Sequence, residues 1–310
     1  MSRRLSLAVS ALPGLLLLTS GAVSAADTPS ASTILAESSP SEWRTLDPAQ
    51  TLYMRLAHDH LVVIELAPAW APEHVANIKT LVQAHYFDGT SIYRVQDNFV
   101  AQWGDPDSDD PKKAKPMGKA KIRLPPEFIR KIDPAAHFTR LPDGDVYAPE
   151  VGFVDGMPAA RDPKTDRAWL VQCYGMVGVS RDNDPTSGNA NTLYVPIGQA
   201  PRRLDRQLTV VGRVVEGMQW IASLPRGPEP LGIYKDATLR TPILSVRLAS
   251  DVPAKNRLQL QALRTDSKTF ARLVEANRDR HDAFYKDPPE RISICNVPLP
   301  IREVPAAHAK

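Results

Sequence analysis

The sequence predicts a mainly β protein, in which short strands close into a barrel capped by two helices. Apolar runs are mostly short and rich in β-branched or aromatic residues, as in strands. Proline makes up 29 of the 310 residues, against a typical share of ~5%, which favours irregular links over long helices. Only one strand–helix alternation is strong, so a parallel βαβ arrangement fits poorly. Many strands, two helices and turn-rich links together favour a closed barrel.

The first 26 residues have the pattern of an export signal. Residues 2–4 (Ser-Arg-Arg) are positively charged, residues 5–18 are largely apolar, and small residues at 23–26 offer a cleavage site. Polar and turn-forming residues interrupt the apolar run, which makes it a poor membrane span. An uncleaved anchor is the alternative. We expect cleavage, a periplasmic location and no membrane span in the mature protein.

The folded domain is expected over residues 43–250. Before it, residues 27–42 are rich in Ser, Thr, Pro and Ala and predict a flexible leader. Residues 61–66 predict a strand, and a helix with apolar residues at helical spacing follows over residues 72–84, with proline in its first turn. The Asp88-Gly89 pair marks a turn before the next strands.

Two further stretches lack the pattern of strands or helices. An acidic run passes into a basic run over residues 105–121, almost without apolar side chains, which predicts a solvated surface loop. Residues 141–166 are rich in Gly, Pro and Asp and predict further irregular structure. Long loops of this kind are often mobile or functional.

Regular structure is expected to resume at residue 176. Strands are predicted over residues 176–180, 193–195, 208–211 and 243–248, and residues 212–218 lead into a short helix. Beyond residue 252, apolar residues at helical spacing predict a helix from Asp266 or Ser267 to Lys286, which Pro288-Pro289 ends.

The most informative segment is residues 91–106, SIYRVQDNFVAQWGDP. It predicts two strands, at 93–95 and 99–103, joined by a polar turn. Alternation along the second strand places Val100 and Gln102 on one face and Phe99 and Ala101 on the other. A permanently charged guanidinium near an aromatic ring and a neutral amide is suited to binding a peptide carbonyl rather than to moving a proton.

This segment closely resembles the signature of cyclophilins, the peptidyl-prolyl cis–trans isomerases. The matching positions are Tyr93-Arg94, Asn98-Phe99, Gln102 and Gly104-Asp105. The resemblance covers roughly residues 61–248. It implies a closed antiparallel β-barrel capped by two helices, and proline-containing polypeptides as clients.

The resemblance also defines two additions to the barrel. The interval before Gly175 is about twice the length expected in a compact cyclophilin, so residues 106–170 are expected to hold an insertion. Residues 251–310 lie beyond the resemblance and are expected to form a helical extension packed on the barrel.

The resemblance assigns roles to individual residues. Arg94 would be the catalytic donor, and Gln102 would orient it and hydrogen-bond the peptide. The residues implied to bind the substrate are, in the proline pocket, Phe99, Val100, Tyr194 and Leu208, at its rim Leu204, and along the peptide Tyr93, Ser180, Arg181 and Thr192. No nucleophile, metal or cofactor is required.

Several positions depart from the cyclophilin pattern. Val100 replaces a methionine, Thr192 a glutamine, Tyr194 a phenylalanine, Arg203 a Trp or Phe, and Leu208 a His or Tyr. The pocket stays apolar, so proline can still enter, but polar contacts are lost. The alternative function is therefore a weakly active or inactive cyclophilin-like module that binds Pro-containing segments.

The composition excludes several other classes. Removal of residues 1–26 takes Lys+Arg from 38 to 36 against 35 Asp+Glu, a net charge of +1 that does not suggest nucleic acid as a partner. His58-Asp59-His60 has no evident third ligand, so we predict a solvated turn rather than a metal site. Hydrolase elbows and phosphate or dinucleotide loops are missing from the sequence. We expect a monomer.

Cys173 and Cys295 are the only cysteines. In an exported protein such a pair can form a disulfide, which would join the last part of the chain to the segment before Met176. Two buried free thiols are the alternative.

Overall fold

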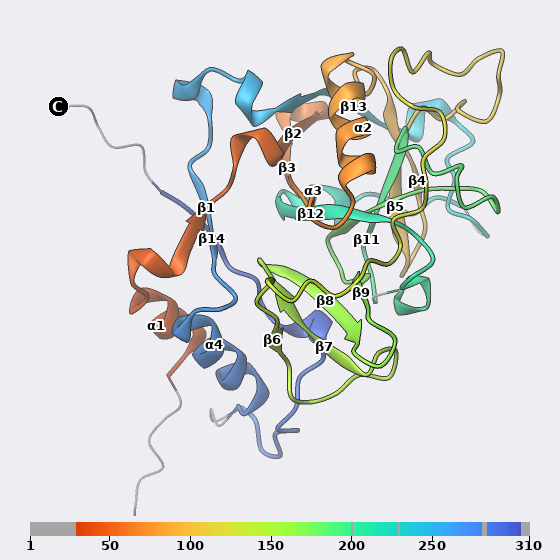
Figure 1. Ribbon diagram of the computed structural model, residues 1–310. Helices are drawn as coiled ribbons and strands as arrows, with labels where there is room; N and C mark the ends of the chain where they lie inside the picture. The colour runs from red at the N-terminus through yellow and green to blue at the C-terminus, as the bar shows by residue number, and fades with distance from the viewer. Residues whose placement is uncertain (1–28, 200, 229, 281–283, 305–310) are drawn as a thin grey trace, which may run out of the picture.

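The structure is a computed structural model that describes residues 29–199, 201–228, 230–280 and 284–304 (Figure 1). The predicted export signal at residues 1–26 lies outside the described residues. No helix among those described is long and apolar enough to cross a membrane.

The centre of the fold is a closed eight-stranded barrel in the order β10-β11-β5-β4-β13-β2-β3-β12. Every neighbouring pair in it is antiparallel, as predicted. The strands are β2 (Thr51–Leu56), β3 (Leu61–Leu66), β4 (Ser91–Val95), β5 (Val100–Gly104), β10 (Met176–Val179), β11 (Thr192–Pro196), β12 (Val210–Glu216) and β13 (Thr241–Leu248).

Two helices close the barrel, α2 (Pro72–Gln83) and α3 (Met218–Ala222). α2 begins at a proline, whose missing N–H costs nothing in the first turn. Its apolar face, with Ile78 and Leu81 fully buried, joins the core formed by the inward side chains of the strands. The prediction of a closed barrel capped by two helices is therefore confirmed.

One boundary inside the barrel differs from the prediction. The sequence suggested a strand ending at residue 211, whereas β12 continues through Gly212 to Glu216. Gly212 pairs with Leu66 of β3, and a Cβ at this position would lie 2.1 Å from the Glu65 carbonyl oxygen. Glycine here therefore allows two strands to approach closely and does not break the strand.

The predicted irregular stretch over residues 141–166 instead contributes to a second sheet, of four antiparallel strands. They are β6 (Thr139–Arg140), β7 (Glu150–Val154), β8 (Met157–Asp162) and β9 (Arg167–Leu170). β7 and β8 are joined by Asp155-Gly156, where both φ angles are positive, as a tight two-residue hairpin turn requires. The Gly-, Pro- and Asp-rich composition suggested irregular structure, although this Asp-Gly pair is a sequence signal for a hairpin.

The first and the last described strands belong to one small sheet beside this one. β1 (Trp43–Thr45) pairs with β14 (Leu260–Leu263), which pairs with β15 (Ile301–Glu303). Helix α1 (Ala31–Ala36) lies against α4 (Lys268–Arg278). The expectation of a flexible leader is wrong for residues 29–42, because Ser30 caps α1 and Ile34 is fully buried.

The C-terminal extension also differs from the prediction. It contains two strands as well as a helix, and the helix ends at Arg278 rather than at Lys286. Phe270 of α4 packs edge-on against Phe153 of β7, at 5.1 Å between ring centroids. The extension therefore packs on the inserted sheet as well as on the barrel, and Figure 1 shows α1, α4 and β6–β9 gathered on one side of the barrel.

A disulfide joins the extension to the segment that precedes β10. Cys173 and Cys295 are bonded, with their Cα atoms 5.1 Å apart and 122 residues apart in the sequence. Cys173 lies in the same apolar core as Phe153 and Phe270. The molecule thus has a barrel core and a further apolar core. We call the latter the second core, and it lies between the inserted sheet, α1 and the C-terminal extension with its helix α4.

Candidate active site

Arg94 lies on β4 directly opposite Gln102 on β5. Its Nε donates to the Leu231 carbonyl at 2.7 Å, Nη1 donates to Oε1 of Gln102 at 3.0 Å, and Nη2 donates to Oε1 of Gln96 at 2.5 Å. A guanidinium has five N–H donors, so this arrangement fixes its plane and leaves donors for a ligand. Burial lowers the pKa of Arg94, but an arginine stays charged in proteins.

Gln102 is oriented from both ends of its amide. Its oxygen accepts from Arg94, and its Nε2 donates to the Tyr93 hydroxyl at 2.6 Å. Burial raises the pKa of Tyr93, so its hydroxyl stays protonated at neutral pH. The result is a short hydrogen-bonded chain, Arg94–Gln102–Tyr93, along one side of the β4–β5 hairpin.

Residues 231–234, which the sequence analysis did not single out, lie beside β4 and help to hold Arg94. Gly232 O accepts from Val95 N at 2.8 Å and Tyr234 N donates to Tyr93 O at 2.9 Å, so residues 231–234 run beside β4. Gly232 has φ +70°, and a Cβ there would lie 2.5 Å from Cα of Gln96. Only glycine fits this close approach without strain, and the approach presents the Leu231 carbonyl to Arg94.

Beside the guanidinium lies a cavity of about 230 Å³. Its walls bring together most of the residues that the sequence analysis proposed, namely Arg94, Phe99, Val100, Gln102, Ser180, Arg181, Tyr194, Leu204 and Leu208. Tyr93 and Thr192 do not line it. They line a neighbouring, more polar cavity of about 290 Å³, which shares Gln102, Ser180 and Arg181 with the first.

Phe99 shares the cavity with Val100 and Gln102, against the predicted alternation. β5 begins at Val100, so Phe99 lies in the turn before it, and its N–H bonds back to Gln96 O at 3.3 Å. Strand alternation does not apply in a turn, and the ring therefore reaches the same side as Gln102. The guanidinium carbon of Arg94 is 5.8 Å from the centre of the Phe99 ring.

Tyr194 closes the cavity from the second wall. Gly178 on the adjacent β10 makes room for its ring, since a Cβ there would lie 2.2 Å from Cζ of Tyr194. The buried Tyr194 hydroxyl donates to Oε1 of Gln172 at 3.0 Å, and burial raises its pKa far above the usual range. The hydroxyl therefore has the partner that a phenol in an apolar pocket needs.

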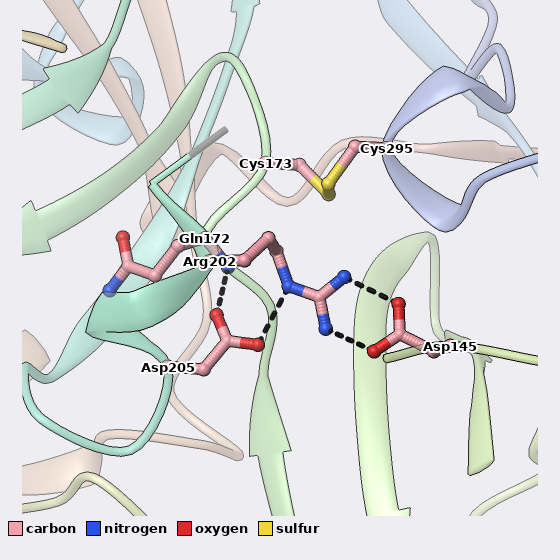
Figure 2. The surroundings of a disulfide bond; sticks show 6 residues. All are labelled: Asp145, Gln172, Cys173, Arg202, Asp205 and Cys295. Carbon is pink, nitrogen blue, oxygen red and sulfur yellow. Dashed lines mark hydrogen bonds and ion pairs between the residues drawn. A yellow bond between two sulfur atoms is a disulfide. The ribbon is translucent and has the colours of Figure 1, made fainter. Parts of the chain in front are cut away.

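Gln172 belongs to a network that links the cavity to the inserted sheet. Its backbone N–H donates to Asp205 at 2.9 Å, and Asp205 accepts from Nε of Arg202 at 2.8 Å. Arg202 also forms two bonds to Asp145 of the insertion, at 2.7 and 2.8 Å. Figure 2 shows the guanidinium between the two carboxylates, with the disulfide above the Arg202 side chain in this view. Leu204, which lines the cavity, is thus held between Arg202 and Asp205.

The buried charge of Arg202 is paired with the carboxylates of Asp145 and Asp205. Burial raises the pKa of Asp205, and the attraction of Arg202 acts against that rise. Burial alone would lower the pKa of Arg202, but its two carboxylate partners outweigh that and raise it. The sequence analysis missed this network, because Asp145 and Gln172 are far in the chain from Arg202 and Asp205 and only the fold brings them together.

At His58-Asp59-His60 the sequence analysis predicted a solvated turn and weighed a metal site against it; the structure has a short 3-10 turn over Ala57–Asp59. His60 stacks on Trp220 at 3.9 Å between ring centroids, and Asp59 pairs with Arg55. Within the described residues no group of three or more His, Cys, Asp or Glu side chains could hold a metal ion.

Comparison with known proteins agrees with this geometry. The family profile described as "Cyclophilin type peptidyl-prolyl cis-trans isomerase/CLD" matches residues 51–246. A protein of Brucella suis named "Probable peptidyl-prolyl cis-trans isomerase" is 30% identical over 185 residues, which are 59% of this chain and 75% of that protein. A "Putative thylakoid lumen peptidyl-prolyl cis-trans isomerase" of Synechocystis is 26% identical over 166 residues, 51% of this chain and 39% of that protein.

Among solved structures, the cyclophilin AquaCyp293 from Hirschia baltica superposes with a TM-score of 0.70 at 25% sequence identity. The match covers 88% of this chain and 96% of that one, so it extends well beyond residues 51–246. The chain therefore belongs to the cyclophilin-type peptidyl-prolyl cis–trans isomerase family, and its enzyme class is peptidyl-prolyl isomerase.

Proposed function

We propose that this isomerase accelerates rotation about X–Pro bonds in exported polypeptide clients, and that Arg94 supplies the catalytic interaction. The observation that carries the proposal is the position of its guanidinium, which is fixed by Leu231 O, Gln102 and Gln96 at the edge of an apolar cavity. The cavity offers no general base, and rotation of an amide needs none.

The chemistry follows from the electronic structure of the imide bond. Rotation passes over a barrier of about 18–20 kcal/mol, because the partial double bond between carbon and nitrogen is lost at the halfway point. The nitrogen lone pair then becomes localised and accepts a hydrogen bond better than in either planar state. Arg94 would donate to that nitrogen or to the adjacent carbonyl, and would stabilise the twisted state selectively.

The rest of the cavity would hold the substrate while it rotates. Phe99, Val100, Tyr194 and Leu208 form apolar walls that fit a proline ring, with Leu204 at the rim. Gln102 would hydrogen-bond the peptide and orient Arg94, and Ser180 and Arg181 would offer backbone groups along the chain of the client. A pocket with little water strengthens each of these electrostatic contacts.

Two observations support export to the periplasm. Residues 1–26 have the composition of a cleavable signal, and the chain carries a disulfide, which is typical of oxidising compartments. The Synechocystis relative is named for the thylakoid lumen. Clients would then be secreted or periplasmic proteins whose X–Pro bonds isomerise slowly.

The test is an isomerisation assay on a short Ala-Pro peptide with the chain lacking residues 1–26. We expect a measurable acceleration over the spontaneous rate, and a loss of at least about tenfold in Arg94→Ala, equivalent to ~1.4 kcal/mol of barrier. Arg272→Ala is the matched control, since Arg272 pairs with Glu37 on the exposed side of α4. If the parent chain does not exceed the spontaneous rate, the second candidate applies, a module that only binds Pro-containing segments.

A further inference from the structure

Three arginines surround the cavity, and none of the described residues that line it is acidic. Arg94 and Arg181 belong to its walls. Arg203 follows Arg202 in the chain and precedes Leu204 of the wall, and its guanidinium carbon lies 5.2 Å from the centre of the Phe99 ring. Phe99 therefore lies within cation–π distance of both Arg94 and Arg203.

The part of the chain that the structure describes offers no carboxylate partner to these three arginines. Within the described residues none of them forms an ion pair, whereas the neighbouring Arg202 contacts two carboxylates. Arg94 donates to a carbonyl and two side-chain amides, and Arg181 donates to backbone carbonyls, among them Gln207 O at 3.0 Å. Arg203 is exposed, and its guanidinium lies over the Phe99 ring.

The acidic side chains nearby lie elsewhere. Asp109 and Asp182 line the neighbouring polar cavity, together with Arg123 and with Arg181, which both cavities share. Asp97, in the turn before Phe99, pairs with Arg226 at 3.1 Å. The uncompensated positive charge is therefore concentrated on the apolar cavity, at its Phe99 and Arg203 side.

We propose that the site selects clients that carry an aspartate or glutamate next to the isomerised proline, and that Arg203 is the main determinant of this preference. The inference rests on the proposed function for the identity of the ligand as an X–Pro segment. A carboxylate at the rim would neutralise charge that the protein leaves unpaired. Because Arg203 is exposed to solvent, the effect is modest, about three- to fivefold at low salt.

The preference is measured with two sets of short peptides that differ at one position. In one set the residue before proline is Glu, Gln or Lys, and in the other the residue after proline is varied in the same way. We expect kcat/KM to fall in the order Glu, Gln, Lys in at least one set. The ratio of Glu to Gln should approach one at about 0.5 M salt, where the screening length is only a few ångströms.

The variant Arg203→Gln identifies the residue responsible. This variant should reduce the ratio of kcat/KM for the Glu peptide to kcat/KM for the Gln peptide to near one, even if the rate on the Gln peptide also changes. Arg206→Gln is the control, because Arg206 lies over Trp169, which does not line the cavity, and it should keep the parent ratio. Equal values for Glu, Gln and Lys in both sets, or an unchanged ratio in Arg203→Gln, would overturn the inference.

Failure of the inference and failure of the proposed function give different results. The rate on the Gln peptides alone tests isomerisation. Dissociation constants for the same peptides, measured by titration, test the charge preference even if no peptide is isomerised. Tighter binding of Glu over Gln that disappears in Arg203→Gln supports the preference, and equal binding excludes it.

Discussion

The two walls of the cavity are held in different ways. Arg94 and Gln102 come from the β4–β5 hairpin, and the hydrogen-bond partners of their side chains are in that hairpin and in residues 230–234. Tyr194 and Leu204 on the other wall are held from behind by Gln172 and Arg202, whose contacts lead to Asp145 of the insertion. The first wall thus carries the chemistry, and the second depends on parts of the chain added to the barrel.

The largest expected effect is a loss of stability when the second core is disrupted. Phe270→Ala removes a fully buried ring that packs on Phe153, which should lower the free energy of unfolding by about 3–5 kcal/mol. Denaturant unfolding measures this, with Val146→Ala as a control at an insertion side chain that is 93% exposed. Variant molecules that remain folded should keep the first wall intact and therefore the activity of the parent. A large loss of activity in these folded molecules would contradict the comparison.

A smaller effect is expected where the second core meets the cavity. Gln172→Leu leaves the buried Tyr194 hydroxyl without its acceptor, which should cost about 1–3 kcal/mol of stability. Adding Tyr194→Phe removes the hydroxyl as well and should recover most of that loss. Unfolding and KM are measured for both single variants and the pair. If the two losses simply add, Gln172 does not act through Tyr194.

The smallest expected effect is a loss of stability that depends on pH. Arg278 of α4 forms two bonds of 2.7 Å to Asp143 of the insertion, and it holds the pKa of that carboxyl below its usual value of 3.8. A lowered pKa in the folded state contributes stability above pH 4, which is lost as the pH falls through the folded value. Asp143→Asn should therefore be less stable than the parent at pH 7, by about 1.5 kcal/mol. The difference should shrink as the pH falls below 4, and a difference that does not change with pH would exclude this cause.

The barrel and its first wall could be predicted from the sequence because their signals are local. The 91–106 segment places Arg94, Phe99 and Gln102 within nine residues and resembles the cyclophilin signature, and the predicted strands around it are short runs of apolar residues, many of them β-branched. The error at Phe99 arose at a turn, where alternation ends. Gly212 was misinterpreted for a related reason, since a glycine in a strand can mark a break or a close approach of two strands.

The resemblance assigned Tyr194 and Leu204 of the second wall to the pocket, but the network that holds this wall could not be predicted because its residues are separated in the sequence. Asp145, Gln172 and Arg202 each lie in segments without strand or helix periodicity, and only the closed fold brings them together. The leader was misassigned for the same reason. Ser- and Ala-rich composition indicates disorder when nothing covers the segment, but here α4 buries Ile34.

The most direct test separates binding from rotation on one Ala-Pro peptide. For the parent chain and Arg94→Ala, the dissociation constant and the rate of cis–trans exchange in the bound state are both measured by NMR. If Arg94 stabilises the twisted amide, the variant should bind within about threefold of the parent and exchange at least about tenfold more slowly. Unchanged exchange in the bound peptide, with the whole loss in affinity, would contradict the account.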